Sequence, residues 1–131
     1  MKDVPEFVTV DEVYRDIASK IIEDKRKDIL AAGIAVGFVG SNRKKVKARD
    51  HVVCGECKKV PDLYKLYCPY DFLIIIYEEN CTGFTDRQME ILLWHELLHI
   101  GIDDKGKAYL RDHDVEEFDD IIRDCGLRWN R

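Results

Sequence analysis

The chain has 131 residues, of which 46% are hydrophobic and 36% charged, enough for a single hydrophobic core in one domain spanning residues 1–131. The formal net charge of −5 gives no overall attraction to nucleic acid, and no segment is long and apolar enough to cross a membrane. The first residues, MKDVPEF, lack the basic and apolar regions of an export signal, and the cysteine count is odd. We therefore expect a cytoplasmic protein with reduced thiols.

The N-terminal part of the chain predicts an amphipathic helix followed by a strand. Thr9 and Glu12 have the spacing of a capping box, and apolar residues from position 13 to position 22 form one stripe. EDKRKD (23–28) would end the exposed side of this helix. Gly33 then marks the turn into the apolar run 34–39, which is typical of a buried strand.

A basic segment follows that strand and contains Arg43, Lys44, Lys45, Lys47 and Arg49. It is too polar to pack, so we expect an exposed loop or hairpin tip. Such a tip can bind phosphate or nucleic acid, or it can be a solvated turn that protects an edge strand. No aromatic residue is interleaved to stack on a base, which favours the solvated turn.

A CGEC motif lies in a short second strand predicted at residues 52–57. The CxxC spacing is half of a zinc-ribbon site, but the other half is missing because the remaining cysteines are isolated (Cys68, Cys81 and Cys125). We interpret the cysteines as plain thiols, with a cluster of Cys54, Cys57 and Cys68 as the alternative.

The strongest strand signal, DFLIIIY at residues 71–77, precedes the strongest helix signal, at residues 84–101. We expect the strand in the centre of the sheet, because it is apolar throughout. For the helix, Thr85 and Gln88 predict a capping box and Gly101 predicts the C-terminal stop. Apolar residues occupy most of the helix circumference, so we expect the helix to be buried.

This helix contains HELLH, the HExxH pattern of zinc peptidases. His95 and His99 are four residues apart and therefore lie on one face of the helix, close enough to share an ion. Glu96 can take a proton from water at the metal without being a ligand. The alternative is three polar residues that are merely hydrogen-bonded to neighbours. We favour the metal site, since burying all three without a function is costly.

A catalytic zinc ion of this type needs a third protein ligand. Beyond a turn signal at Asp104 to Gly106, apolar residues repeat at helical spacing up to Gly126 and predict a C-terminal helix. His113 stands just before this helix and is our preferred third ligand. The remaining candidates are Glu116 and Glu117, as alternative ligands or as partners that orient an imidazole, and Tyr109, as a hydrogen-bond donor to the oxyanion.

HELLHIG followed by HDVEEF, and preceded by GECKKVPDLYKLYCPYDF, resembles the phage-type metallopeptidases, which are small zincin-like domains. The likeness runs from about residue 33 to residue 129. It implies that His95, His99 and His113 are zinc ligands and that Glu96 is the catalytic base. More distantly, the chain is similar to SprT-like proteases, which act on DNA-bound proteins, but it has His113-Asp114 where those proteins have His-Gly.

Together these features predict an α+β, zincin-like domain. Its small, mainly antiparallel sheet would have three or four strands, with the N-terminal helix over it, the HELLH helix beneath it and a C-terminal helix bringing the third ligand. The expected activity is zinc-dependent hydrolysis of a peptide or protein substrate held along the sheet region 72–77. The alternatives are a zinc-stabilised domain without catalysis and a nucleic-acid-associated protein that uses the basic segment.

Overall fold

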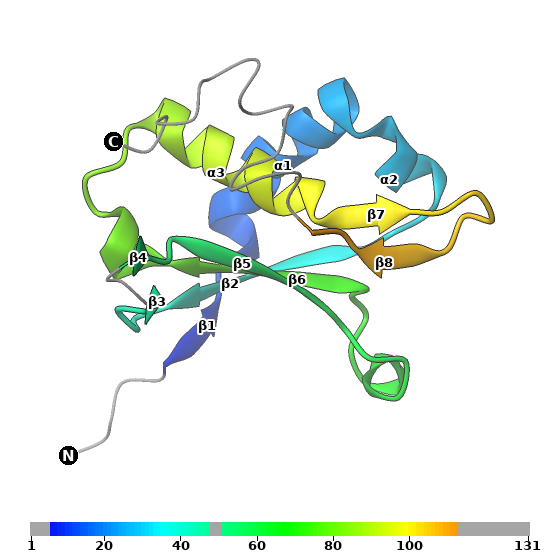
Figure 1. Cartoon of the computed structure of the whole chain (residues 1–131), viewed down its shortest axis with the longest axis horizontal. Coiled ribbons are helices and arrows are strands. Elements are labelled where there is room, and N and C mark those ends of the chain that lie inside the picture. Colours follow the sequence, from blue (N-terminus) through cyan, green and yellow to red (C-terminus); the bar gives the residue numbers. More distant parts are fainter. Residues whose placement is uncertain (1–5, 48–50, 113–131) are drawn as a thin grey trace.

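The computed structural model describes residues 6–47 and 51–112. The expected C-terminal helix lies outside these residues, and so do His113, Glu116 and Glu117. In chain order (Figure 1) the elements are β1 (Phe7–Thr9), α1 (Asp11–Lys25), α2 (Lys27–Ala31), β2 (Val36–Ser41), β3 (Val46–Lys47), β4 (His51–Val52), β5 (Gly55–Lys59), η2 (Tyr64–Leu66), β6 (Phe72–Tyr77), η3 (Glu78–Cys81), α3 (Asp86–Leu98), β7 (Ile100–Ile102) and β8 (Ala108–Leu110).

The main sheet is mixed and has four strands in the order β1-β2-β6-β5. β6 pairs in parallel with β2 and antiparallel with β5, while β1 is antiparallel to β2. The central position expected for the apolar run 71–77 is thereby confirmed. Both faces of β6 are covered, since Phe72, Ile74 and Ile76 lie in the main core and Ile75 and Tyr77 lie in a smaller cluster with Val53. The fold is α+β, as expected.

Both long helices lie on the same face of the sheet (Figure 1). Tyr14, Ala18 and Ile21 of α1 share one core with Leu93 and Leu97 of α3. The expectation that the HELLH helix lies on the face opposite to the N-terminal helix is therefore wrong. The physical reason is that the apolar side of α1 is covered by α3 and the sheet together, so that the two helices fill a single core.

α1 begins without the capping box expected from Thr9 and Glu12. Thr9 belongs to β1, and no side chain caps the helix. Instead, the Asp11 carboxylate accepts a hydrogen bond of 2.9 Å from the Phe38 amide and forms an ion pair of 2.9 Å with Arg15. The first residue of the helix thus connects α1 to β2, a contact between residues far apart in the chain.

Arg26 separates α1 from α2 and is only 8% exposed, although we expected it on the exposed side of the helix. Its guanidinium donates hydrogen bonds to the carbonyl oxygens of Leu97 (2.5 Å) and Ile100 (2.6 Å) and pairs with Asp28 at 3.0 Å. The hydrogen bond from Arg26 holds the pKa of the Asp28 carboxyl below its usual range. Carbonyls at a helix C-terminus lack intrahelical donors, so Arg26 stabilises the end of the HELLH helix.

We predict that Arg26→Met lowers the free energy of unfolding by about 2 kcal/mol, because methionine keeps much of the buried stem but leaves buried carbonyls without their donor. Thermal and urea unfolding followed by circular dichroism would measure the loss. Lys27→Met is the matched control, since Lys27 is exposed. Equal losses in the two variants would show that the buried hydrogen bonds contribute nothing.

Candidate metal centre

The HELLH helix, α3, begins with the capping box expected from the sequence. The backbone amide of Gln88 donates to Thr85 Oγ1 at 3.2 Å, and the backbone amide of Thr85 donates to Gln88 Oε1 at 2.8 Å. The helix is buried as expected, over Ile91, Leu92, Leu93, Trp94, Glu96, Leu97 and Leu98. This packing fixes the direction in which the polar side chains of the motif point.

The C-terminal end of α3 differs from the expectation. The helix ends at Leu98, and its C-cap residue, His99, has a right-handed helical backbone conformation. Gly101 lies in strand β7 and does not form the left-handed C-terminal stop that we expected. The glycine is needed for another reason, because a Cβ at this position would lie 2.4 Å from the ring of Tyr109. Gly101 therefore makes room for the aromatic ring of β8.

His95, Glu96 and His99 form a group in which one donor atom from each residue lies within 4.8 Å of the others. The two imidazole centroids are 5.3 Å apart, and His95 Nε2 lies 3.8 Å from Glu96 Oε2. The Glu96 side chain is only 3% exposed. In the described part of the chain this is the one cluster of its kind. Imidazoles are suitable ligands for a transition metal, so His95 and His99, with a carboxylate beside them, fit the metal that HExxH implies.

The orientation of His99 is set by Arg111, a residue that the sequence did not single out. His99 Nδ1 lies 2.7 Å from the Arg111 carbonyl oxygen, and the Arg111 amide donates to the His99 carbonyl at 2.6 Å. A carbonyl only accepts, so Nδ1 carries the proton and Nε2 is left for a metal. Such a partner typically fixes the tautomer of a metal-binding histidine.

Arg111 reaches His99 through the β7–β8 hairpin, which we did not expect as strands. The Asp103 carboxylate accepts hydrogen bonds from the amides of Lys105 (2.9 Å) and Lys107 (2.8 Å), and Gly106 has a φ of 79°. The turn signal at Asp104 to Gly106 is thus confirmed. Each strand has only three residues, too few for a periodic pattern to reveal.

Gly55, the glycine of the CGEC motif, contacts the Glu96 side chain. A Cβ at residue 55 would lie 3.1 Å from Glu96 Oε2 and 3.3 Å from its Cγ, closer than a side chain normally packs. The motif therefore brings β5 against the carboxylate, a role that its CxxC spacing did not reveal. The expected strand 52–57 is divided between β4 and β5.

The cysteines of the described residues are free thiols, as expected (Cys54, Cys57, Cys68 and Cys81). The alternative metal cluster of Cys54, Cys57 and Cys68 is not formed. A hydrogen bond with Cys81 lowers the pKa of the Cys54 thiol. Burial raises the pKa of the Cys57 thiol, and the nearby charge of Glu96 adds to this effect.

The other described candidates, Tyr109 and the residues of the basic segment, do not belong to the group of His95, Glu96 and His99. Tyr109 lies in β8 with its ring over Gly101, on the hairpin that leads to Arg111. In the basic segment, Lys45 pairs with Glu56 and Arg43 lies 3.8 Å from Glu6. These ion pairs favour the solvated turn over a phosphate-binding surface.

A buried helix that carries two histidines and a glutamate within reach of one ion is typical of metallohydrolases. The family model described as "Putative phage metallopeptidase" matches residues 6–131. The chain therefore belongs to this phage metallopeptidase family. No curated protein and no solved structure matches it. Among the described residues, no helix is long and apolar enough to span a membrane.

We predict that Gly101→Ala lowers the free energy of unfolding by about 1–2 kcal/mol, because the added methyl group displaces the Tyr109 ring. In a Tyr109→Ala background the same change should cost much less, so a double-mutant cycle measured by chemical denaturation should show coupling. Gly83→Ala is the control, since a Cβ there meets no atom within 4 Å. Additive effects of the Gly101 and Tyr109 changes would contradict this account.

Proposed function

We propose that the protein is a zinc-dependent peptidase with a zincin-like arrangement, in which His95, His99 and His113 bind the ion and Glu96 is the general base. The observation that carries the proposal is the convergence of His95, Glu96 and His99 on a buried helix in a member of a metallopeptidase family. Imidazole donors favour zinc over metals such as manganese, which prefer oxygen ligands.

His113 is the proposed third ligand because the chain passes the site just before it. The Arg111 carbonyl lies 2.7 Å from His99 Nδ1. Two further residues of extended chain span at most about 7 Å, a length that is compatible with a ligand at position 113. Glu116 and Glu117 remain the alternative donors, or partners that orient an imidazole. Three protein ligands would leave one coordination position open for catalysis.

In the proposed reaction Glu96 takes a proton from the attacking water and passes it to the leaving amine. A bound zinc ion would supply the Lewis acidity that polarises the scissile carbonyl and lowers the pKa of water. Burial shields the Glu96 carboxylate from bulk solvent, and Gly55 lets it lie directly against β5. Tyr109 is a candidate donor to the oxyanion, since β8 lies close to β5.

An extended substrate would bind along β5 rather than along β6, which we had expected to form the binding floor. β6 pairs with a strand on each side, whereas β5 is at the edge of the four-stranded sheet. The Tyr77 amide donates to Cys54 and the Val60 amide donates to Asp71. In an antiparallel pair the alternate residues, Gly55, Cys57 and Lys59, therefore direct their backbone groups outward, where a peptide can add as a strand.

We predict that the purified protein carries about one equivalent of zinc and that His95→Ala or His99→Ala loses it. His113→Ala should weaken zinc binding far more than Glu117→Ala does, because the imidazole supplies the third bond. Metal analysis and competition with a chromogenic chelator would measure both effects. The reverse ranking would assign the third bond to a glutamate, and full metal content in both helix variants would place the metal elsewhere.

We predict that Glu96→Gln keeps zinc but lowers hydrolysis by roughly 10²-fold or more, the scale typical of losing a general base. Glutamine preserves the shape and a hydrogen-bonding group while removing the basic carboxylate. Cleavage of a denatured protein mixture, with metal content as the internal control, would measure the loss. If the wild type cuts nothing while zinc has four protein ligands, the domain uses zinc for stability alone.

A further inference from the structure

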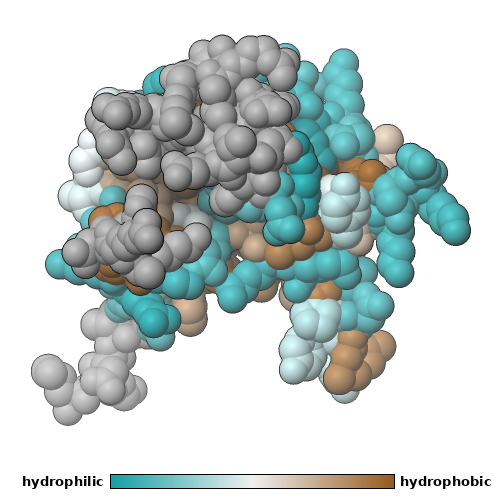
Figure 2. All heavy atoms as spheres, in the orientation of Figure 1, coloured by the Kyte–Doolittle hydropathy of each residue, from teal (hydrophilic) through white to brown (hydrophobic). Residues whose placement is uncertain are grey.

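The segment between β5 and β6, residues 61–70, projects from the side of the sheet opposite to the helices (Figure 1). We call it the arm. Four of its large apolar side chains are strongly exposed, namely Leu63 (69%), Tyr64 (62%), Leu66 (75%) and Tyr67 (95%). Figure 2 shows the arm as a pale and brown projection at the lower right. Clustered exposure of this kind marks an interaction site rather than ordinary surface.

The arm has a defined conformation. Its tip forms the short helix η2, in which the Tyr67 amide donates to the Tyr64 carbonyl at 3.0 Å. Lys65 pairs with Asp71 at 2.6 Å, and the other oxygen of Asp71 accepts the Ala35 amide at 2.8 Å. These contacts connect the tip to the sheet, so the apolar side chains are held in solvent by the fold itself.

We propose that the arm is a second binding surface for the substrate and that it selects unfolded polypeptides with apolar or aromatic side chains at a distance from the cleaved bond. This inference rests on the proposed function. Its basis is the continuity of β5 with the arm, since β5 begins at Gly55 beside Glu96 and its last residue, Lys59, is followed directly by Val60 and the arm.

The geometry sets the distance between the two binding surfaces. A peptide paired with β5 advances roughly 3.3 Å per residue, so four residues beyond Gly55 it has reached Lys59. The next few residues then face the arm. Apolar side chains about five to eight positions from the cleaved bond would thus contact Leu63, Leu66 and Tyr67.

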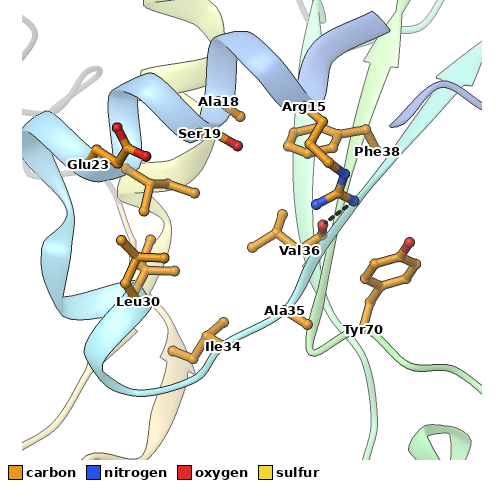
Figure 3. A pocket seen from close by; sticks show the side chains of 12 residues that line it. Arg15, Ala18, Ser19, Glu23, Leu30, Ile34, Ala35, Val36, Phe38 and Tyr70 are labelled. Carbon is orange, nitrogen blue, oxygen red and sulfur yellow. Dashed lines mark hydrogen bonds between the residues drawn. The ribbon is translucent and has the colours of Figure 1, made fainter. Parts of the chain in front are cut away.

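A second copy of this chain is the competing occupant, because the body carries a cavity that can receive an apolar side chain. This cavity has a volume of about 220 Å³ and lies between α1, α2 and β2, where Leu30, Ile34 and Val36 line it (Figure 3). Arg15 at its edge already donates to the Val36 carbonyl at 3.2 Å. No residue of β5 lines the cavity, whereas the arm continues β5 itself, which favours the substrate.

The test compares the double variant Leu66→Ser/Tyr67→Ser with the control Val8→Ser/Val13→Ser, whose residues are exposed on β1 and α1 (49% and 60%) and do not line the cavity. Cleavage sites in a denatured, carboxymethylated protein mixture are mapped by mass spectrometry. Synthetic peptides are then made from a preferred site, one long enough to reach the arm and one that ends before it. We expect the long-to-short ratio of kcat/KM to fall about tenfold in the arm variant, the scale of burying one large apolar side chain. The control variant should keep the wild-type ratio.

Binding gives a readout that does not depend on cleavage. Fluorescently labelled, carboxymethylated α-lactalbumin is titrated with the Glu96→Gln protein with and without the arm substitutions, and we expect the arm substitutions to lower the affinity about tenfold.

If wild type cleaves but neither the ratio nor the affinity changes, the arm inference is overturned and the proposed function stands. If wild type cleaves nothing but binding depends on the arm, the arm still binds unfolded polypeptide, but its role in substrate selection fails together with the peptidase proposal. Sedimentation completes the test, because a dimer that only the arm variant dissociates, with an unchanged ratio, would assign the arm to a second copy.

Discussion

The constraint on which this structure depends is that α3 carries the Glu96 carboxylate into the protein interior, beside the partly buried imidazoles of His95 and His99. Glu96 is one of seven buried residues of a thirteen-residue helix, and buried polar groups are stable only when neighbouring elements supply partners for them. The helix is fixed at both ends by hydrogen bonds, through Thr85 and Gln88 at the start and Arg26 at the end. The capping box is local, whereas Arg26 comes from a distant part of the chain.

Two further elements shape the surroundings of the polar face of α3. β5 approaches Glu96 at Gly55, where the missing side chain leaves space for the carboxylate. The β7–β8 hairpin returns the chain to His99 and places the Arg111 carbonyl against its Nδ1 atom. Both contacts bring backbone rather than side chains to the histidine and the glutamate, which keeps the approaches rigid. A site that must hold donors in a fixed geometry benefits from such support.

The strand order of the main sheet leaves β5 as an edge strand. Because β6 is paired on both sides, β5 is the strand beside α3 at which an extended chain can add. The same strand continues into the arm, whose exposed leucine and tyrosine side chains are held by the ion pair of Lys65 with Asp71. Gly55 beside Glu96, the edge of β5 and the exposed apolar side chains of the arm therefore follow one another along residues 55–70. This order is consistent with a substrate that is extended when it binds.

The sequence by itself determined the features that depend on local spacing. The HELLH group, the capping box at Thr85 and the central strand at 72–77 follow from helical and strand periodicity, and the structure has all three. Tertiary structure alone decided that Arg26 is buried, that Gly101 makes room for Tyr109, and that Gly55 contacts Glu96. It also decided that α1 and α3 share a face of the sheet. These features could not be predicted because each depends on a partner that is not set by local spacing, and an arginine or glycine has the same local pattern whether its partner is water or a buried helix.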